Sequence, residues 1–176
     1  MAGSADAVLA AGDFASQHEG LQETIDVLSA IEVLTVLVPG NNETDEALRT
    51  ACAGWPAATV LHGESAEIAG VAFFGLGAGV PVTPWDWSFD LSDEDAAARL
   101  AACPEDAVLV VHSPPKGYVD ESGGNHLGSE AILSTINERT PRVAVCGHIH
   151  DCAGQEAAVG ATRVLNLGPA GTFIEV

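Results

Sequence analysis

The sequence predicts a single α/β domain over residues 1–176, in which mixed β-sheets are layered as a sandwich and flanked by helices. Three observations lead to this prediction. Short apolar runs alternate with helix-like stretches, no internal repeat or low-complexity linker interrupts them, and 176 residues suit one hydrophobic core. Apolar residues make up 47% of the chain, which is enough for a large core and excludes global disorder.

The N-terminal part is expected to alternate strands with helices. Residues 7–11 form an apolar run that ends at Gly12-Asp13, and residues 33–38 are β-branched and end at a turn-forming Pro-Gly-Asn-Asn. Between them, residues 21–31 carry apolar side chains at helical spacing. Thr44 is a suitable cap for a helix that runs to Thr50, because acidic residues fill its first turn.

The middle of the chain is expected to form a run of short strands, a loop and a helix. Residues 58–76 alternate in polarity and break at two glycines, which predicts successive antiparallel strands. Residues 75–87 are rich in glycine, proline and tryptophan and should form a loop. Ser92 then caps an alanine-rich helix that stops before Pro104.

The C-terminal part should complete the sheets. Val108–Val111 and Val143–Cys146 are fully apolar and strand-sized, and residues 129–138 between them read as a helix. Residues 164–167 and 173–176 are expected to be closing strands.

Composition excludes several classes of function. Six basic residues, of which Lys116 is the only lysine, face 25 acidic ones, so the net charge of −19 argues against a nucleic-acid partner. No apolar stretch approaches the ~20 residues that span a bilayer. Residues 1–5 show no secretory pattern, so we expect a cytoplasmic protein. Without CxxC spacing, the four cysteines are expected to be free thiols, with Cys146 in the core.

Four polar residues each follow the end of a predicted strand, where ligands gather in α/β sheets: Asp13, Asn41, His112 and His148. Taken alone, Gly12-Asp13 is an ordinary turn, and Asn41 tolerates turn geometry. In an extended Gly147-His148-Ile149-His150, both histidines would point to one side and could reach one metal cluster. The mixed oxygen and nitrogen ligands suit Mn²⁺, Fe or Zn²⁺ better than Ca²⁺.

The order of these motifs resembles that of the calcineurin-like metallophosphoesterases. The resemblance rests on Gly12-Asp13, Gly40-Asn41-Asn42-Glu43, His112 and the Gly-His-Ile-His motif, and it covers nearly the whole chain. The run HSPPKGYVDESGGNHLGSEAI is similar to small bacterial and archaeal members. The resemblance implies the family's layered fold and the hydrolysis of a small phosphomonoester or phosphodiester by metal-activated hydroxide. Mn²⁺ is the first choice of metal, with Fe, Zn²⁺ or Ni²⁺ as alternatives.

The resemblance also implies roles for individual residues. Asp13 corresponds to the carboxylate that bridges two metals, and His150 to a ligand of the first metal. Asn41, His112 and His148 correspond to the remaining ligands of the second metal. The family's Asp-x-His motif does not occur ahead of Asp13, so we expect a fold without that N-terminal strand and a weakened first site.

Asn42 is the expected catalytic residue, at the position where many members carry a proton-donating histidine. An amide cannot transfer protons at neutral pH, so Asn42 favours phosphodiesters or activated leaving groups. A non-catalytic relative that serves as a binding or regulatory module is the alternative reading.

Several further residues have two readings each. His18 and Cys152 are candidate replacement ligands or plain loop residues, and His126 either lines a substrate pocket or is an ordinary loop histidine. His62 is expected at the surface. Trp85 and Trp87 either border the cleft or pack within their loop.

An unpaired strand edge at residues 7–11 is expected either to pair within the chain or to recruit a second copy. The second outcome would make the protein a homo-oligomer.

Overall fold

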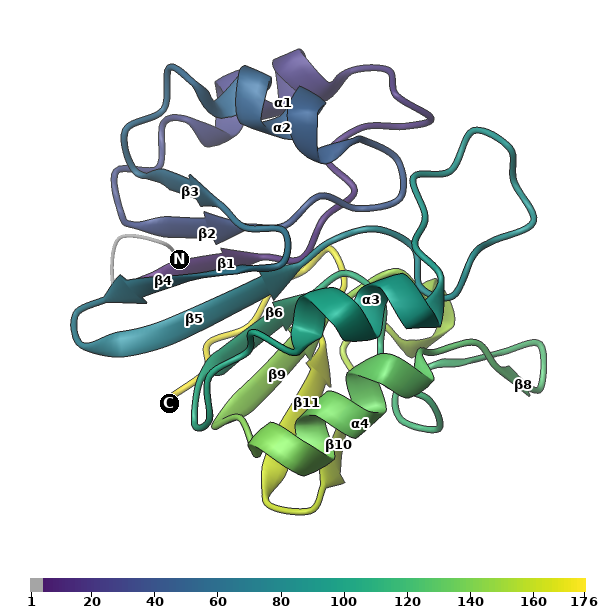
Figure 1. Ribbon diagram of the computed structural model, residues 1–176. Coiled ribbons are helices and arrows are strands. Elements are labelled where there is room, and N and C mark those ends of the chain that lie inside the picture. The colour runs from purple at the N-terminus through teal and green to yellow at the C-terminus, as the bar shows by residue number, and fades with distance from the viewer. Residues whose placement is uncertain (1–4) are drawn as a thin grey trace.

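The computed structural model describes residues 5–176, which form two β-sheets between two pairs of helices (Figure 1). The smaller sheet is parallel and has the strand order β1-β2-β3. Helices α1 and α2 lie on its outer face. The elements of this half are β1 (Val8–Ala10), α1 (Leu21–Leu28), β2 (Thr35–Leu37), α2 (Asp45–Cys52) and β3 (Ala58–Val60).

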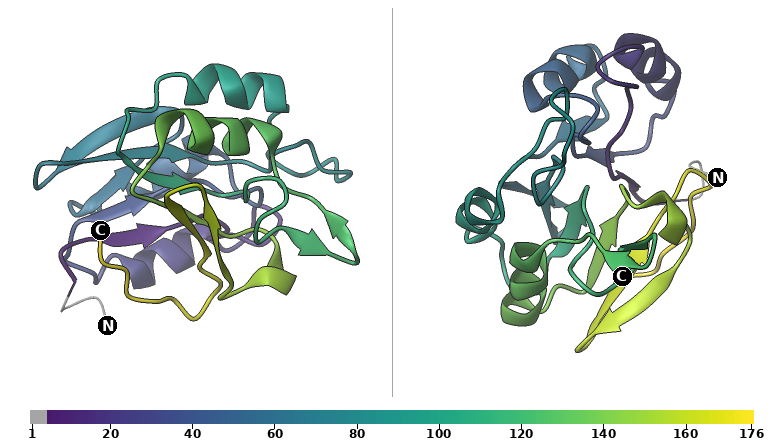
Figure 2. Two further views of the ribbon diagram at one scale, coloured as in Figure 1. Left: turned by 90° about the horizontal axis from the view of Figure 1, so that it is seen from below. Right: turned by 90° about the vertical axis from the view of Figure 1, so that its right-hand side faces the viewer.

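The larger sheet has the strand order β10-β11-β9-β6-β5-β4, with parallel pairs at its centre and one antiparallel pair at each edge. Helices α3 and α4 cover its outer face, and Figure 2 shows the two helix pairs on opposite sides of the molecule. The larger half comprises β4 (Glu64–Ile68), β5 (Val71–Leu76), α3 (Asp93–Leu100), β6 (Val108–Val111), α4 (Glu130–Arg139), β9 (Val143–Cys146), β10 (Glu156–Val159) and β11 (Thr162–Asn166).

Two small elements lie outside these layers. A short hairpin consists of β7 (Glu121–Ser122) and β8 (Asn125–His126), and a single 3₁₀ turn, η2, spans His150–Cys152. The side chain of Ser122 donates to the Asp151 carboxylate, which links the hairpin to the turn.

The layers follow from strands that bury both faces. In β6, Val108 and Val110 pack in the core between the sheets, whereas Leu109 and Val111 pack under α3 and α4. Successive side chains of a strand point to opposite faces, so a fully apolar run marks a strand that is covered on both sides. The predicted α/β architecture of mixed sheets flanked by helices is confirmed.

The predicted helix starts are also found. The Thr44 side chain accepts a hydrogen bond from the backbone N–H of Ala47, and Ser92 accepts one from Asp95. Each cap satisfies a backbone donor that the first helical turn would leave unpaired. All four cysteines are free and buried, and within residues 5–176 no helix has the length and apolar character needed to cross a membrane.

Two predicted strand arrangements are wrong. Strand β3 does not pair with β4 but runs parallel to β2 in the other sheet, so only β4 and β5 form an antiparallel hairpin within residues 58–76. Residues 173–176 form no strand; Ile174 packs its side chain against the core between the sheets instead. Strand β1 pairs with β2 of its own chain and is the edge strand of the smaller sheet, so within residues 5–176 its other edge has no strand partner and the expectation for residues 7–11 stays a prediction.

Candidate metal centre

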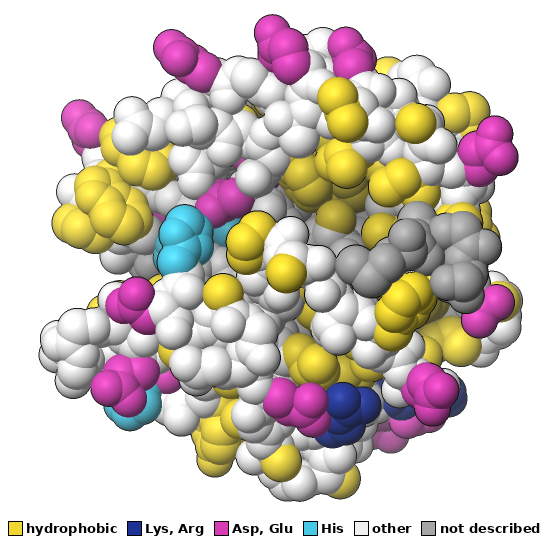
Figure 3. Space-filling model, turned by 180° about the vertical axis from the view of Figure 1, so that it is seen from behind, with side chains coloured by type: hydrophobic (Ala, Val, Ile, Leu, Met, Phe, Trp, Pro, Cys, Tyr) yellow, Lys and Arg dark blue, Asp and Glu magenta, His cyan; other side chains and the backbone are white. Residues whose placement is uncertain are grey.

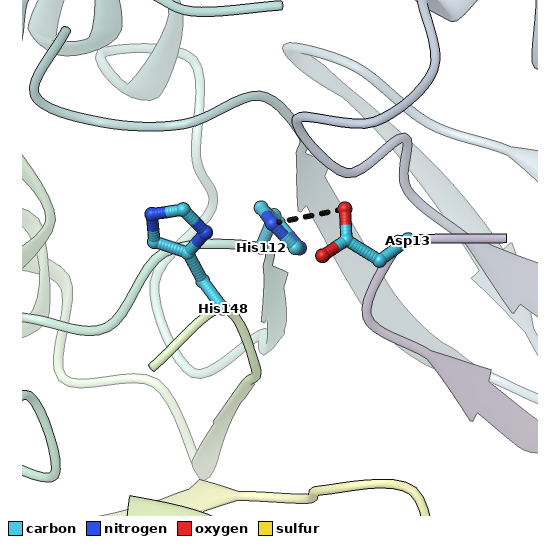
Figure 4. Close-up of side chains that lie close together, drawn as sticks. All are labelled: Asp13, His112 and His148. Atoms are coloured by element: carbon cyan, nitrogen blue, oxygen red, sulfur yellow. Dashed lines mark ion pairs between the residues drawn. The ribbon is translucent and has the colours of Figure 1, made fainter. Parts of the chain in front are cut away.

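Four polar residues meet where the strand ends of the two sheets approach each other. Asp13 and Asn41 follow β1 and β2 of the smaller sheet, and His112 and His148 follow β6 and β9 of the larger one. Figure 4 shows the side chains of Asp13, His112 and His148 close together, with the ion pair between His112 and Asp13 marked. One ligand atom from each of these three residues lies within 4.8 Å of the others.

The chain itself fixes the tautomer of His112. Its Nδ1 lies 2.6 Å from the backbone oxygen of Ala11, which can only accept a hydrogen bond. The Nδ1 atom therefore carries the hydrogen, and Nε2 keeps a free lone pair. This Nε2 lies 3.2 Å from Asn41 Oδ1 and 3.5 Å from Asp13 Oδ1, and the side chain is only 1% exposed. A backbone acceptor behind the ring is the arrangement typical of a metal-binding histidine.

A chain of hydrogen bonds fixes the amide of Asn41. The Ser88 hydroxyl donates to Asp90 Oδ1 at 2.7 Å, and the other oxygen of Asp90 accepts from the N–H and hydroxyl of Thr83. Since its only hydrogen is used, Ser88 must accept from Asn41 Nδ2, which lies 2.9 Å away. This orients Asn41 Oδ1 toward His112.

The inner face of the site consequently presents lone pairs without hydrogens between them. Asp13 Oδ1, Asn41 Oδ1 and His112 Nε2 are acceptors that face one another. A bound cation relieves the repulsion among them. Carboxylate, amide oxygen and imidazole nitrogen together suit a divalent transition metal, so the residues present fit such an ion.

Asp13 is held in its charged form. Burial alone would raise the pKa of this carboxyl, but nearby His112 and hydrogen bonds from Asn42 outweigh that effect and lower the pKa. Asp13 Oδ1 accepts from the backbone N–H groups of Asn41 and Asn42 at 3.1 and 3.2 Å. A charged carboxylate is the form that binds a cation.

Glu43 joins the two loops that carry Asp13 and Asn41. Its buried carboxylate accepts from the backbone N–H groups of Asp13 at 2.9 Å, Ala15 at 3.0 Å and Gly40 at 2.6 Å. Burial raises the pKa of Glu43 above its ordinary value, despite these hydrogen bonds. Glu43 is therefore a structural clamp behind the site.

The backbone at the site has an unusual conformation. Asp13 and His148 both have a φ of 63°, a left-handed geometry that non-glycine residues seldom adopt. The neighbouring loops also come very close, because a Cβ on Gly12 would lie 2.6 Å from His112 Nδ1, and one on Gly40 would collide with the Asp13 carboxylate. Such conformations collect at functional sites.

His148 is a neutral imidazole at ordinary pH. Burial, with a smaller contribution from His112, lowers the pKa of His148 to about 4. The two rings lie side by side, with their centroids 4.8 Å apart. An uncharged ring keeps the lone pair that a metal requires.

His150 does not join this group. The left-handed turn at His148 breaks the extended geometry expected of Gly147-His148-Ile149-His150, and His150 begins η2 with an exposed side chain. The segment is therefore not extended, which is the geometry that the expectation for the two histidines assumed. Within residues 5–176, the side chains grouped closely enough to hold an ion do not include His150, so its role as a ligand stays a prediction.

Asn42, the expected catalytic residue, is half-buried beside the site. Its side-chain oxygen accepts from the backbone N–H of Gln17 at 2.8 Å. The two candidate replacement ligands make other contacts, because His18 Nε2 lies 2.6 Å from the backbone oxygen of Trp87 and Cys152 Sγ lies 3.4 Å from that of Glu121.

Two other histidines lie outside the site. His62, expected at the surface, is 7% exposed, because its Nδ1 accepts a hydrogen bond from the backbone N–H of Gly77 and its ring lies near Phe89. His126 is half-exposed on β8, and its Nδ1 lies 2.7 Å from the buried carboxylate of Asp120.

Residues 12–173 match the family model described as metallophosphoesterase, calcineurin superfamily. The chain belongs to this superfamily. All four residues at the strand ends, Asp13, Asn41, His112 and His148, lie within the matched segment.

Three of the proteins that this chain resembles show how far the sequences have diverged. A UPF0046 protein of Caenorhabditis elegans is 29% identical over 96 residues, which are 54% of this chain and 33% of the worm protein, so the match spans about a third of that relative. One crystal structure, 25% identical, has a TM-score of 0.70 and covers 86% of this chain and 64% of its own. TT1561 of Thermus thermophilus, 18% identical, has a TM-score of 0.72 over 94% of this chain and 78% of its own, which shows the shared fold alone.

Sequence reasoning missed the residues that orient Asn41. Ser88 and Asp90 lie in a loop without periodicity, some 47 positions from Asn41 in the case of Ser88. Their only signal in the sequence is the concentration of short hydrogen-bonding side chains among aromatic ones.

Proposed function

We propose that this metallophosphoesterase hydrolyses small phosphomonoesters or phosphodiesters with the help of a divalent metal, Mn²⁺ being the first choice. The observation that carries the proposal is the set of lone-pair atoms from Asp13, Asn41 and His112 that face one another without a hydrogen between them, with His148 beside them. Membership of the superfamily supports the same chemistry.

A divalent cation at this position would supply positive charge and Lewis acidity at the phosphate. The net charge of −19 makes this contribution necessary, because the chain would otherwise repel an anionic substrate. Asp13, Asn41, His112 and His148 would hold the ion. The backbone of Ala11 and the Ser88 hydroxyl keep His112 and Asn41 in the required orientation.

Asn42 would contact the substrate as a hydrogen-bonding group and would not transfer a proton. Its oxygen accepts from Gln17 and its side chain also hydrogen-bonds to Asp13, which leaves one amide hydrogen to donate to a substrate. Leaving groups that depart without protonation, as in diesters and activated esters, suit such a site. Polymeric nucleic acid does not, since only six basic residues are present in the chain.

The test is hydrolysis of bis-p-nitrophenyl phosphate with added Mn²⁺. His148→Ala should remove the metal-stimulated rate, because it deletes one imidazole from the group. His126→Ala is the matched control, since His126 lies outside the group, and it should retain the rate. Full metal-stimulated hydrolysis by His148→Ala would contradict the proposal.

The second candidate is a relative that binds a metal without turning over a substrate. The position of His150 favours it, because this exposed histidine lies outside the one group of ligands found in the described part of the chain, whereas the family chemistry uses two metals. Stoichiometric metal binding with no hydrolysis of any phosphoester would support this candidate over the first. A cytoplasmic location and a homo-oligomer remain predictions that neither candidate requires.

A further inference from the structure

Two of the three tryptophans form a stack that is partly exposed to solvent. The rings of Trp85 and Trp87 have centroids 5.6 Å apart and planes within 14° of parallel, and Trp85 is 49% exposed. The third, Trp55, is 4% exposed in the core under α1 and α2, and its indole N–H donates to the backbone oxygen of Ile31. The stacked pair therefore lies outside the core and presents aromatic surface to solvent.

The stack adjoins the candidate metal centre. Ser88, which follows Trp87 directly, accepts from the Asn41 side chain, and the N–H of Phe89 donates to the Asn41 backbone oxygen at 2.9 Å. On the other side, the ring of His18 contacts the backbone oxygen of Trp87. The backbone N–H of His18 donates to the backbone oxygen of Asn42. In Figure 3, histidine and acidic side chains lie in a hollow with apolar side chains along its margin.

The loop that carries the stack is rigidly held. The N–H of Gly79 donates to the oxygen of Phe89, that of Leu91 donates to the oxygen of Gly79, and that of Ser88 donates to the oxygen of Trp85. The Asp90 carboxylate adds the two hydrogen bonds from Thr83. An aromatic surface that is already ordered binds a ligand without a further loss of conformational entropy.

The charge beside the Trp85–Trp87 stack determines which part of a ligand can bind to it. Asp86, which separates the two tryptophans in the sequence, is exposed. Its negative charge disfavours a second anionic group of the ligand at this surface. A neutral planar ring is favoured, because aromatic side chains stack on the π-face of any base.

We propose that Trp85 and Trp87 form a stacking platform for a planar aromatic group of the phosphoester whose phosphate occupies the metal centre. This inference rests on the proposed function and assigns it a substrate class, phosphoesters that carry a nucleobase or an aryl ring. The two parts of the site then have separate roles. The metal centre binds the phosphate, and the platform selects the group that is esterified to the phosphate.

Calorimetric titration in the presence of Mn²⁺ tests the platform without requiring turnover. The probes are adenosine 5′-monophosphate, phenyl phosphate and glycerol 2-phosphate, which share a phosphate and differ in the attached group. Trp85→Ala should weaken binding of the aromatic probes about tenfold and leave glycerol 2-phosphate unchanged. Trp85→Phe should restore most of the affinity, because it keeps an aromatic face. Phe173→Ala, another exposed aromatic residue, is the control and should bind all three probes like the original chain.

The probes also distinguish the sources of the aromatic group. Loss for adenosine 5′-monophosphate alone identifies a nucleobase site, and loss for both aromatic probes identifies a general aryl site. Equal weakening of glycerol 2-phosphate, or no change for any probe, would overturn the platform. If the chain hydrolyses no phosphoester but Trp85→Ala still selectively loses aromatic affinity, the proposed hydrolysis fails and the platform stands.

Discussion

The floor and the rim of the candidate centre are built in opposite ways. The floor consists of Asp13, Asn41, His112 and His148, and the side chains of the first three are held by hydrogen bonds to the backbone and to Ser88. The rim consists of Trp85, Trp87 and His150 on a loop and a single turn, and the side chains of Trp85 and His150 are exposed there. The floor residues follow strands of both sheets, so the packing of the two sheets fixes their positions. The rim residues lie outside the core and can be substituted without disturbing it.

The comparison predicts that the largest loss follows from removing a floor ligand. Asp13→Asn keeps the shape of the side chain and removes its charge, so Mn²⁺ affinity should fall by more than about 100-fold, beyond the usual cost of losing an outer-shell partner. Calorimetric titration with Mn²⁺ measures it. Asp26→Asn, an exposed acid on α1, is the control. Equal losses in both variants would mean that general charge, and not this site, attracts the ion.

Removing the clamp beneath the floor should be next in size. Glu43→Gln replaces one acceptor oxygen by an NH₂ group that faces backbone N–H donors, so the free energy of unfolding should fall by about 1–3 kcal/mol. Chemical denaturation checks this. Glu138→Gln, exposed on α4, should change stability little. An unaltered unfolding midpoint for Glu43→Gln would show that its three hydrogen bonds contribute nothing.

Releasing the Asn41 amide should have a smaller effect. Ser88→Ala deletes the acceptor for Asn41 Nδ2, which lets the amide rotate, and should weaken Mn²⁺ binding about tenfold without unfolding the chain. Asp90→Asn, which disturbs the same network, should act in the same direction. Ser134→Ala on α4 serves as the matched serine control. An unchanged Mn²⁺ affinity of Ser88→Ala would show that the orientation of the Asn41 amide does not contribute to binding of the ion.

The smallest effect is expected for Asn42, which lies beside the floor residues. Asn42→Ala should reduce the rate of bis-p-nitrophenyl phosphate hydrolysis much less than His148→Ala does, because an amide supplies a hydrogen bond and no proton. Steady-state rates of the two variants make the comparison. A greater loss from Asn42→Ala would reverse the two assignments.

Local patterns in the sequence were sufficient for most elements. The apolar run of β6 and the caps Thr44 and Ser92 are found as predicted, since their signals lie within a few neighbouring residues. The partner of β3 was missed, because pairing with β2 is a contact across the fold that alternation within residues 58–76 does not encode.

The candidate site divides along the same line. Its residues at strand ends, such as Asp13 and His112, could be identified from position alone. The turn that separates His148 from His150, and the burial of His62, depend on backbone conformation and packing between distant segments. Neither appears in the residue types themselves.

The central claim is that one ion binds at Asp13, Asn41, His112 and His148. Elemental analysis after loading with Mn²⁺ and mild dialysis tests it most directly. We predict close to one equivalent for the chain and nearly none for His112→Ala. Two tightly held ions, or one equivalent that survives in His112→Ala, would contradict the claim.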